Sequence, residues 1–192
     1  MKKSSIAWII IGVIVLILVI YVISGYNRFV TLDQNINGKW SEVESQYQRQ
    51  ADLIPNLVSV VSSSLSVETK FVKDVVDART RWASAQSQLQ KDIAGQQMNN
   101  GISAFVSAVA ENYPVLQANK QYIALTDELS GTQNRITTAR GRYIESIQLY
   151  NTAIKRFPAN VLAEIYGFEG KEYYRAEAGS LETPDLGTGT LP

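Results

Sequence analysis

The sequence contains no cysteine and no histidine. Without cysteine, the chain has no disulfide, no thiolate chemistry and no lipoprotein-type lipid anchor. Without histidine, it lacks the Glu-x-x-His ligand pairs of dimetal helical bundles, and its many serines lack the base of a hydrolytic triad. We therefore expect no catalytic residue, no metal site and no cofactor.

An excess of charge of one sign is also missing. The 18 basic and 18 acidic residues cancel, and no basic block of the kind that binds nucleic acid occurs. The sequence has neither a phosphate-cradling glycine-rich loop nor a nucleophile elbow. These absences argue against a nucleic-acid partner and against several common classes of enzyme.

One stretch, residues 6–23, contains no charged and no amide side chain. As a helix rising 1.5 Å per residue it spans about 27 Å, close to the ~30 Å hydrocarbon core of a bilayer. Trp8 lies near one end and Tyr21 near the other, where aromatic rings settle at membrane–water interfaces. The pattern predicts a transmembrane anchor in the lipid bilayer, preceded by a short flank at residues 1–5.

A cleaved signal peptide is the alternative for this stretch. Lys2 and Lys3 form a positive leader, and Val22-Ile-Ser24 offers small residues near a cleavage site. The apolar run is longer than the ~7–15 residues of a signal peptide, which favours a retained anchor. Basic residues are also denser before the run than after it, which predicts a cytoplasmic N-terminus and an exported C-terminal domain.

Helical periodicity dominates the rest of the chain. After the anchor, large apolar residues recur every three or four positions and mark one helical stripe: Phe29, Leu32, Ile36, Trp40, Val43 and Tyr47. Proline is tolerated in the first turn of a helix but breaks its interior. We therefore expect this helix to end near Gln50 and a new one to start at Asp52, which would place Pro55 in a first turn. A single long helix kinked at Pro55 is the alternative.

The second helix is expected to carry an inner face of Leu57, Val61, Leu65, Val72, Val75, Trp82 and Leu89. Two glycines and an asparagine pair within Lys91–Gly101 predict a loop. A third, shorter helix follows from Ile102 and should stop at Tyr113, because the residue before Pro114 is driven out of helical angles.

The fourth helix is the most regular and should run from about Leu116 to Arg156. Its stripe comprises Leu125, Leu129, Thr132, Ile136, Ala139, Tyr143, Ile147, Tyr150, Ile154 and Phe157. Four amphipathic helices with short connections predict an all-α fold, an up-and-down four-helix bundle over residues 26–175. A coiled coil between chains is the alternative for so long a stripe, but its tyrosines, with Trp40 and Trp82, are bulky for such a seam. The apolar segment Val161–Phe168 should fold back over one end of the bundle, and residues 176–192 read as a disordered tail.

The sequence resembles the LemA family. The resemblance rests on motifs in the family's order and spacing: Tyr26-Asn27, Trp40-Ser41, Asp52-Leu-Ile-Pro-Asn-Leu57, Ala78-Arg79, Asn112-Tyr-Pro114, Asn134-Arg-Ile136, Ala139-Arg140, Tyr150-Asn151 and Phe157-Pro158. It implies a single-pass protein of the bacterial cytoplasmic membrane carrying a four-helix bundle, with no established enzymatic activity and roles in membranes or the cell envelope. The chain departs from the family pattern at Val67-Glu68, where His-Glu is common, and at Gly141-Arg142 and Ile144.

Five polar residues inside these motifs are the candidate site residues: Asn56, Arg79, Asn134, Arg135 and Arg140. Arg135 and Arg140 flank the stripe of the fourth helix, from which they could reach Glu or Asp on neighbouring helices, and partly buried ion pairs of this kind fix helix register. A structural role is favoured, and a docking surface for an acidic partner is the alternative.

The sequence thus predicts a membrane-anchored structural or adaptor protein of the bacterial cell envelope that acts through a protein partner or self-association. The alternative is a receptor for a small ligand or peptide, or an enzyme, with its site between bundle helices or under residues 159–175.

Overall fold

The computed structural model describes residues 3–64 and 69–172, and over these ranges the fold is all-α, as predicted. Five α-helices and one short 3₁₀ helix follow one another without any strand in the described ranges. Their bounds are α1 Lys3–Ser64, α2 Thr69–Ser84, α3 Gln88–Asn112, η1 Pro114–Ala118, α4 Lys120–Lys155 and α5 Ala159–Tyr166.

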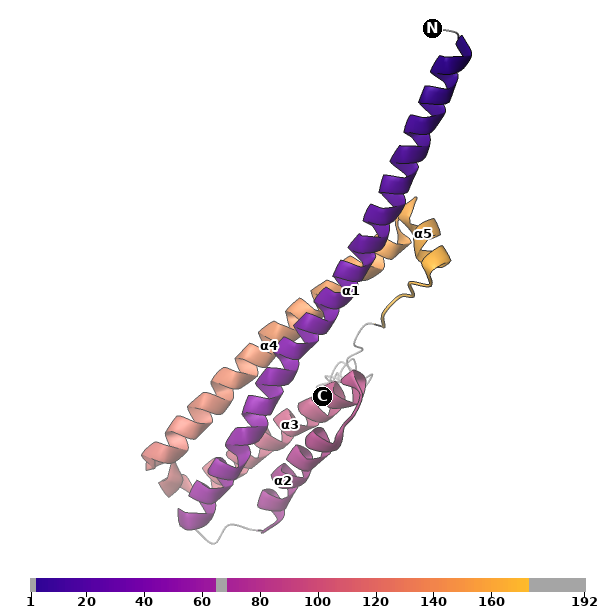
Figure 1. Ribbon diagram of the computed structural model, residues 1–192. Helices are drawn as coiled ribbons and strands as arrows, with labels where there is room; N and C mark the ends of the chain where they lie inside the picture. The colour runs from indigo at the N-terminus through magenta and orange to yellow at the C-terminus, as the bar shows by residue number, and fades with distance from the viewer. Residues whose placement is uncertain (1–2, 65–68, 173–192) are drawn as a thin grey trace, which may run out of the picture.

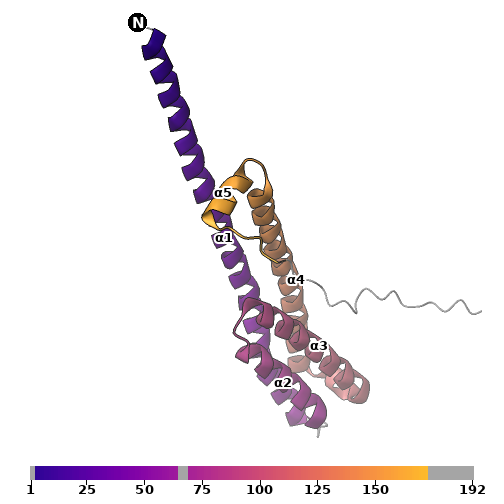
Figure 2. The same ribbon diagram turned by 90° about the vertical axis from the view of Figure 1, so that its right-hand side faces the viewer.

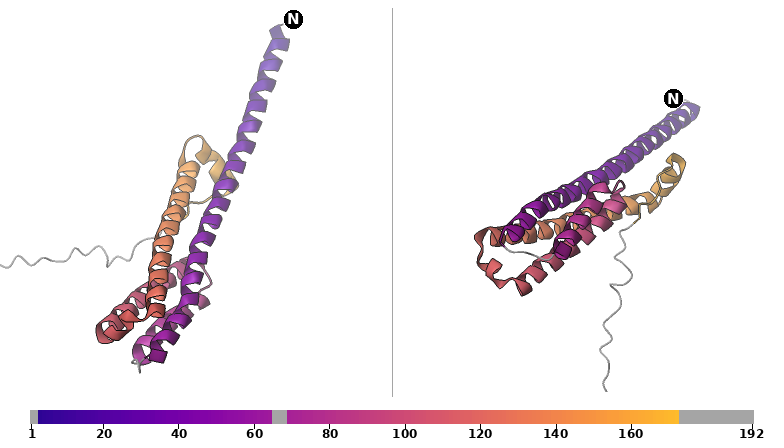
Figure 3. Two further views of the ribbon diagram at one scale, coloured as in Figure 1. Left: turned by 90° about the vertical axis from the view of Figure 1, so that its left-hand side faces the viewer. Right: turned by 90° about the horizontal axis from the view of Figure 1, so that it is seen from below.

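The helices are arranged as two antiparallel pairs of unequal length. α1 and α4 lie side by side, and successive long helices run in alternating directions (Figure 1). α2 and α3 form a shorter pair that covers only the half of α1 and α4 farthest from the N-terminus (Figures 2 and 3). The N-terminal part of α1 projects beyond every other element, and α5 caps the near end of α4.

α1 runs without interruption through Pro55, so the predicted break between Gln50 and Asp52 is wrong. A proline nitrogen carries no hydrogen, and it therefore leaves the carbonyl oxygen four residues earlier, that of Ala51, without its helical donor. Arg79 of α2 donates its Nε–H to this oxygen over 2.9 Å. A side chain from a neighbouring helix thus replaces the missing hydrogen bond, and the helix continues.

The loop predicted at Lys91–Gly101 is also wrong, because this segment lies inside α3. The helix begins earlier, after Ser87, whose side chain accepts from the backbone N–H of Gln90 in a capping box. Gly95 is buried within the helix, and a Cβ built on it would lie 2.6 Å from the ring of Tyr47 in α1. The glycine therefore serves close packing between helices rather than a turn.

We expect Gly95→Ala to destabilise the protein although alanine is the better helix former. Forcing a methyl against the fully buried Tyr47 ring costs about 1–3 kcal/mol, more than the roughly 1 kcal/mol that alanine gains in propensity. Gly141→Ala is the matched control, because nothing lies within 4 Å of its added Cβ. The melting temperature should fall for Gly95→Ala and rise for Gly141→Ala. A higher melting temperature for both would contradict the packing argument.

The core has two parts. The larger joins α1 from Trp40 to Val61 with α2, α3, η1 and the first half of α4, and the smaller joins the α1 segment around Phe29 and Ile36 with the end of α4 and α5. The predicted stripe of α1 is buried or, at Leu32, packed against the core, and Trp40 and Trp82 are buried. The stripe of α4 is confirmed except at its last member, since Phe157 is 84% exposed.

The remaining boundaries differ in detail. α3 stops before Tyr113 and Pro114, as predicted. α4 begins at Lys120 rather than near Leu116, because η1 intervenes and Asn119 caps the helix by accepting from two backbone N–H groups. The inner face predicted for a single second helix is divided among three helices. Leu57 and Val61 lie in α1, and Leu89 lies in α3, where it is 58% exposed.

Segment Ala159–Tyr166 forms α5, and its buried Leu162 and Ala163 pack into the smaller core, as the predicted fold-back requires. Leu65, Val67-Glu68 and the predicted tail at residues 176–192 lie outside the described residues.

Candidate functional site

A buried ion pair connects α4 to α3 at the centre of the bundle. The guanidinium of Arg140 forms an ion pair with the carboxylate of Asp92. Nε lies 3.0 Å from Oδ1, and Nη2 lies 3.2 Å from Oδ2. The Tyr47 hydroxyl of α1 donates to Oδ1 over 3.4 Å. The Asp92 side chain is 8% exposed and that of Arg140 is 21% exposed. Three helices therefore meet at one carboxylate, which fixes their register.

Burial raises the pKa of the Asp92 carboxyl group above its ordinary value of 3.8. The charge of Arg140, its hydrogen bond and the hydrogen bond from Tyr47 act in the opposite direction and lower that pKa. Burial also raises the pKa of the neighbouring Tyr143 hydroxyl, and the charge of Asp92 adds to that increase. The arrangement suits a structural clamp, in which a buried charge is held by a fixed partner.

Further ion pairs link the helices around this clamp. Lys91 of α3 pairs with Glu44 of α1. Glu128 of α4 accepts from Arg49 of α1 at 2.6 Å and from Arg135 of its own helix at 3.3 Å. These pairs are more exposed than the Asp92–Arg140 pair, so each contributes less to stability.

The candidate residues from the sequence fall in different places. Arg140 holds Asp92, and Arg79 donates to the Ala51 carbonyl. Asn134 and Arg135 are exposed neighbours on a shallow groove of about 410 Å³ between α1 and α4. Asn56 is exposed on α1. The five therefore do not converge on one site.

Sequence reasoning missed a polar cavity of about 350 Å³ between α1, α3 and α4. It is lined by amide, hydroxyl and apolar side chains: Gln50, Asn99, Ile102, Ser103, Val106, Ser107, Thr126, Leu129, Ser130, Gln133 and Asn134. Gln50 is 2% and Asn99 8% exposed, and the side-chain oxygen of each is buried without a hydrogen-bond partner among residues 3–64 and 69–172. The signal in the sequence was an amide on an otherwise apolar stripe, at Gln50 next to Ala51.

This cavity has no acid or base of its own. Its lining carries no ionisable group, and among residues 3–64 and 69–172 no three carboxylates gather in a way that could hold a metal ion. Its chemistry is limited to neutral hydrogen bonding, which can hold water or an uncharged polar molecule.

At the other end of α4, the chain is fastened by a strap over residues 167–172. The Asn151 side-chain amide donates to the carbonyl oxygen of Lys171 over 2.8 Å and accepts from its backbone N–H over 2.9 Å. The Tyr150 hydroxyl donates to the Glu169 carbonyl over 3.0 Å, and the Lys171 ammonium lies 2.9 Å from Asp33 of α1. The hydrogen bond from the Lys171 ammonium to the Asp33 carboxylate raises the pKa of Lys171.

We expect Asn151→Ala to release this strap while leaving the helices folded. Two hydrogen bonds of about 1 kcal/mol each are lost, so hydrogen exchange at the Lys171 amide should accelerate roughly 30-fold. Thr152→Ala, at the exposed neighbouring position, is the control and should leave that rate unchanged. Unaltered exchange in Asn151→Ala would show that the strap is held by other contacts.

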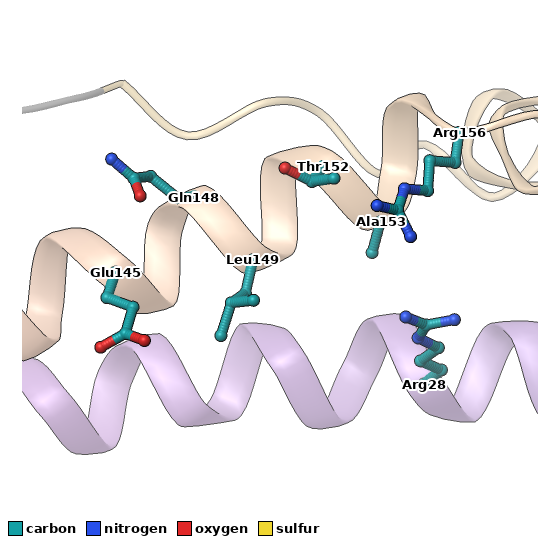
Figure 4. Close-up of a pocket in the computed structure, with 7 residues that line it drawn as sticks. All are labelled: Arg28, Glu145, Gln148, Leu149, Thr152, Ala153 and Arg156. Carbon is teal, nitrogen blue, oxygen red and sulfur yellow. The ribbon is translucent and has the colours of Figure 1, made fainter.

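The end of the bundle nearest the N-terminus of α1 carries a smaller pocket of about 300 Å³ between α1 and α4. Arg28 of α1 and Arg156 after α4 lie across from each other at one end of it, and Glu145 lies at the opposite end (Figure 4). Neither arginine forms an ion pair with any residue that the structure describes.

Beyond this pocket, α1 is long and apolar enough to cross a membrane. Its most apolar 18-residue window has a mean hydropathy of 2.9, and none of that window is buried within the protein. Trp8 is 73% exposed, and the Ile, Val and Leu side chains from Ile9 to Ile20 are about half exposed.

Comparison with protein families matches residues 39–186 to the LemA family. Among curated proteins, the chain is 30% identical to magnetosome protein MamQ 2 and to magnetosome protein MamQ 1 of Paramagnetospirillum magneticum, over 87% of this chain and 72% of each of theirs. It is 28% identical to magnetosome protein MamQ of Magnetospirillum gryphiswaldense over the same shares. The family match covers most of the chain, and the resemblance noted in the sequence is confirmed. The chain belongs to the LemA family.

Proposed function

We propose that this protein is a membrane-anchored structural or adaptor protein of the bacterial cell envelope. In this proposal α1 crosses the cytoplasmic membrane once, and the helical domain lies on the extracytoplasmic side. The domain acts through contacts with a protein partner or a second copy and performs no catalysis.

The observation that carries the proposal is the uncovered apolar surface at the start of α1. Soluble proteins rarely expose a contiguous apolar surface of this size, because removing such a surface from water lowers the free energy by about 25 cal/mol for each Å². Within the described part of the chain, the side chains of α1 from Trp8 to Tyr21 are exposed, and α1 becomes a core helix from Phe29. A bilayer is the environment that such a segment requires.

Two further observations support a role without catalysis. The buried carboxylate of Asp92 is paired with Arg140, as in a structural clamp. The MamQ relatives are named as magnetosome proteins, for a structure rather than for a reaction.

Membrane topology can be tested with single cysteines, because the chain has none of its own. A Thr137→Cys variant places a thiol at an exposed position on α4. In intact spheroplasts, a membrane-impermeant maleimide should label it, and alkaline carbonate should leave the protein in the membrane pellet. Labelling only after lysis would reverse the orientation, and release by carbonate would contradict the anchor.

The adaptor role can be tested by cross-linking in intact membranes followed by capture of the full chain. We expect specific protein partners, or cross-linked copies of the chain, that are absent when residues 1–23 are deleted. Recovery of the chain alone, cross-linked to nothing, would contradict the role.

A second candidate function, binding of a small uncharged ligand, has one observation in its favour: the unpartnered oxygens of Gln50 and Asn99 beside the cavity. Native mass spectrometry of the purified chain tests it. A bound molecule that disappears in Gln50→Leu/Asn99→Leu supports a receptor. No bound molecule, together with higher stability of the variant, supports a polar but structural cavity.

A further inference from the structure

α5 lies at the level where the apolar part of α1 ends. Leu162 of α5 packs directly on α1 at Gly25, where an added Cβ would lie 2.9 Å from its Cδ1. The rings of Tyr26 and Tyr166 are 5.1 Å apart in an edge-to-face contact. Val22 packs against the smaller core, to which Leu162 belongs. Residue 25 is only two positions beyond the apolar run, a rise of about 3 Å. If residues 6–23 fill the hydrocarbon core, α5 is at the depth of the lipid headgroups.

One exposed side of α5 is apolar, and the polar residues Asn160 and Glu164 are exposed beside it. Leu162 and Ala163 face the core, whereas Val161 is 49% and Ile165 70% exposed, and their spacing of four places them on one side of the helix. Phe157, in the connection before α5, is 84% exposed. In Figures 1 and 2 this connection is the part of the bundle closest to the projecting end of α1.

Two arginines lie close to the connection before α5. Arg28 is five positions beyond the apolar run, about 7.5 Å along the helix axis, and Arg156 directly precedes Phe157. They lie across from each other at one end of the pocket in Figure 4. Like charges held together without a carboxylate partner in the described structure are suited to bind an anion between them. Two acidic residues are nearby: Glu145 is at the far end of the pocket, and Glu164 is exposed on α5.

We propose that α5 and the connection before it form a second membrane contact. Phe157, Val161 and Ile165 insert at the boundary between headgroups and acyl chains, and Arg28 and Arg156 bind the phosphate of a phospholipid headgroup. Interfacial helices with an apolar face and adjacent basic residues bind bilayers in this way. This inference rests on the proposed anchor, which places the bilayer at this end of the bundle.

The experiment uses the full-length protein in vesicles and a nitroxide label on single cysteines. The label at Ile165→Cys reports on α5, that at Val13→Cys on the anchor, and that at Thr137→Cys on an exposed position of α4 beyond the smaller core. Accessibility is measured to oxygen, which concentrates in lipid, and to a water-soluble nickel complex. We expect lipid-like values at residues 13 and 165 and a water-like value at residue 137.

The labels separate the possible failures. A water-like value at Val13→Cys would overturn the anchor and with it the inference. A lipid-like value there, with a water-like value at Ile165→Cys, would overturn the α5 contact alone. Magnetic coupling between labels at residue 165 of two copies would show that a second chain covers this face instead of lipid.

The arginines are tested in vesicles that contain phosphatidylglycerol, with Arg28→Gln/Arg156→Gln in the Ile165→Cys background. Each basic side chain near an anionic surface contributes about 1 kcal/mol, so the ratio of lipid-contacting to water-contacting label should fall roughly 30-fold. Arg81→Gln/Lys120→Gln carries the same charge change at exposed positions elsewhere and should leave the ratio unchanged. Equal ratios for both double variants would overturn the phosphate contact.

Discussion

Arg140→Leu is expected to lower the free energy of unfolding by about 3–5 kcal/mol, because it leaves the Asp92 carboxylate buried without its charge partner. Leucine fills similar space, so the loss comes from the unpaired charge rather than from a cavity. Chemical denaturation of the reconstituted protein, followed by circular dichroism, measures the change.

Two variants make this measurement specific. Arg142→Leu removes an arginine that is 61% exposed and lies 4.0 Å from Glu42, so it should cost less than about 1 kcal/mol. Arg140→Leu/Asp92→Leu removes both charges and should recover much of the loss. If Arg140→Leu left stability unchanged but removed a cross-linked partner, the residue would belong to a docking surface.

The loss caused by Arg140→Leu should also depend on pH. Because burial raises the pKa of Asp92 above 3.8, the folded state holds this proton more tightly than the unfolded state does. The stability that this group contributes is therefore fully present below pH 3.8 and is lost as the pH rises through the folded-state pKa. Arg140→Leu removes two influences that lower this pKa, so its effect should be largest near neutral pH and shrink on acidification. A loss that is constant with pH would contradict the unpaired-charge explanation.

Arg79→Met is expected to destabilise the protein by about 2 kcal/mol. It leaves the Ala51 carbonyl, in a residue that is 2% exposed, without a donor, and hydrogen bonds from charged groups are worth about 1.5–3 kcal/mol. The loss should depend on Pro55, because an alanine there restores the helical N–H that reaches Ala51. We therefore expect Arg79→Met to cost less than about 0.5 kcal/mol in a Pro55→Ala background.

Arg81→Met is the control for this cycle, since Arg81 is an exposed arginine on the same helix. It should cost little in either background. Equal losses for Arg79→Met with and without Pro55 would mean that Arg79 acts through other contacts and not as the substitute donor.

The sequence predicted the fold class, the stripes of α1 and α4 and the stop before Pro114, because these depend on periodicity and local sterics. It misplaced the features that depend on a contact between distant segments. Pro55 reads as a helix break unless Arg79 is known to reach Ala51, and Gly95 reads as a loop unless the Tyr47 ring is known to pass beside it. In both cases the two residues in contact, Ala51 with Arg79 and Tyr47 with Gly95, are at least 28 positions apart, and local rules cannot predict such a contact.

The prediction of site residues from the sequence was limited in the same way. Arg140 was singled out as a polar residue beside a core stripe, but its partner, Asp92, lay in the segment expected to be a loop. The cavity lined by Gln50 and Asn99 was missed, since its lining comes from α1, α3 and α4, and an amide at Gln50 alone does not show which residues of the other two helices face it. Arg28 and Arg156 meet only because α1 and α4 are antiparallel.

The continuity of α1 has a mechanical consequence. The same 62-residue helix supplies the proposed anchor and one wall of the core, without a hinge at Ser24-Gly25. A domain on a flexible tether samples many orientations, whereas in the proposed arrangement this one would inherit its tilt from the angle at which α1 crosses the lipid. The part of α1 beyond that crossing rises about 60 Å. The distal tip is thereby held at a set height, and any force applied there is transmitted as torque to the membrane-embedded segment.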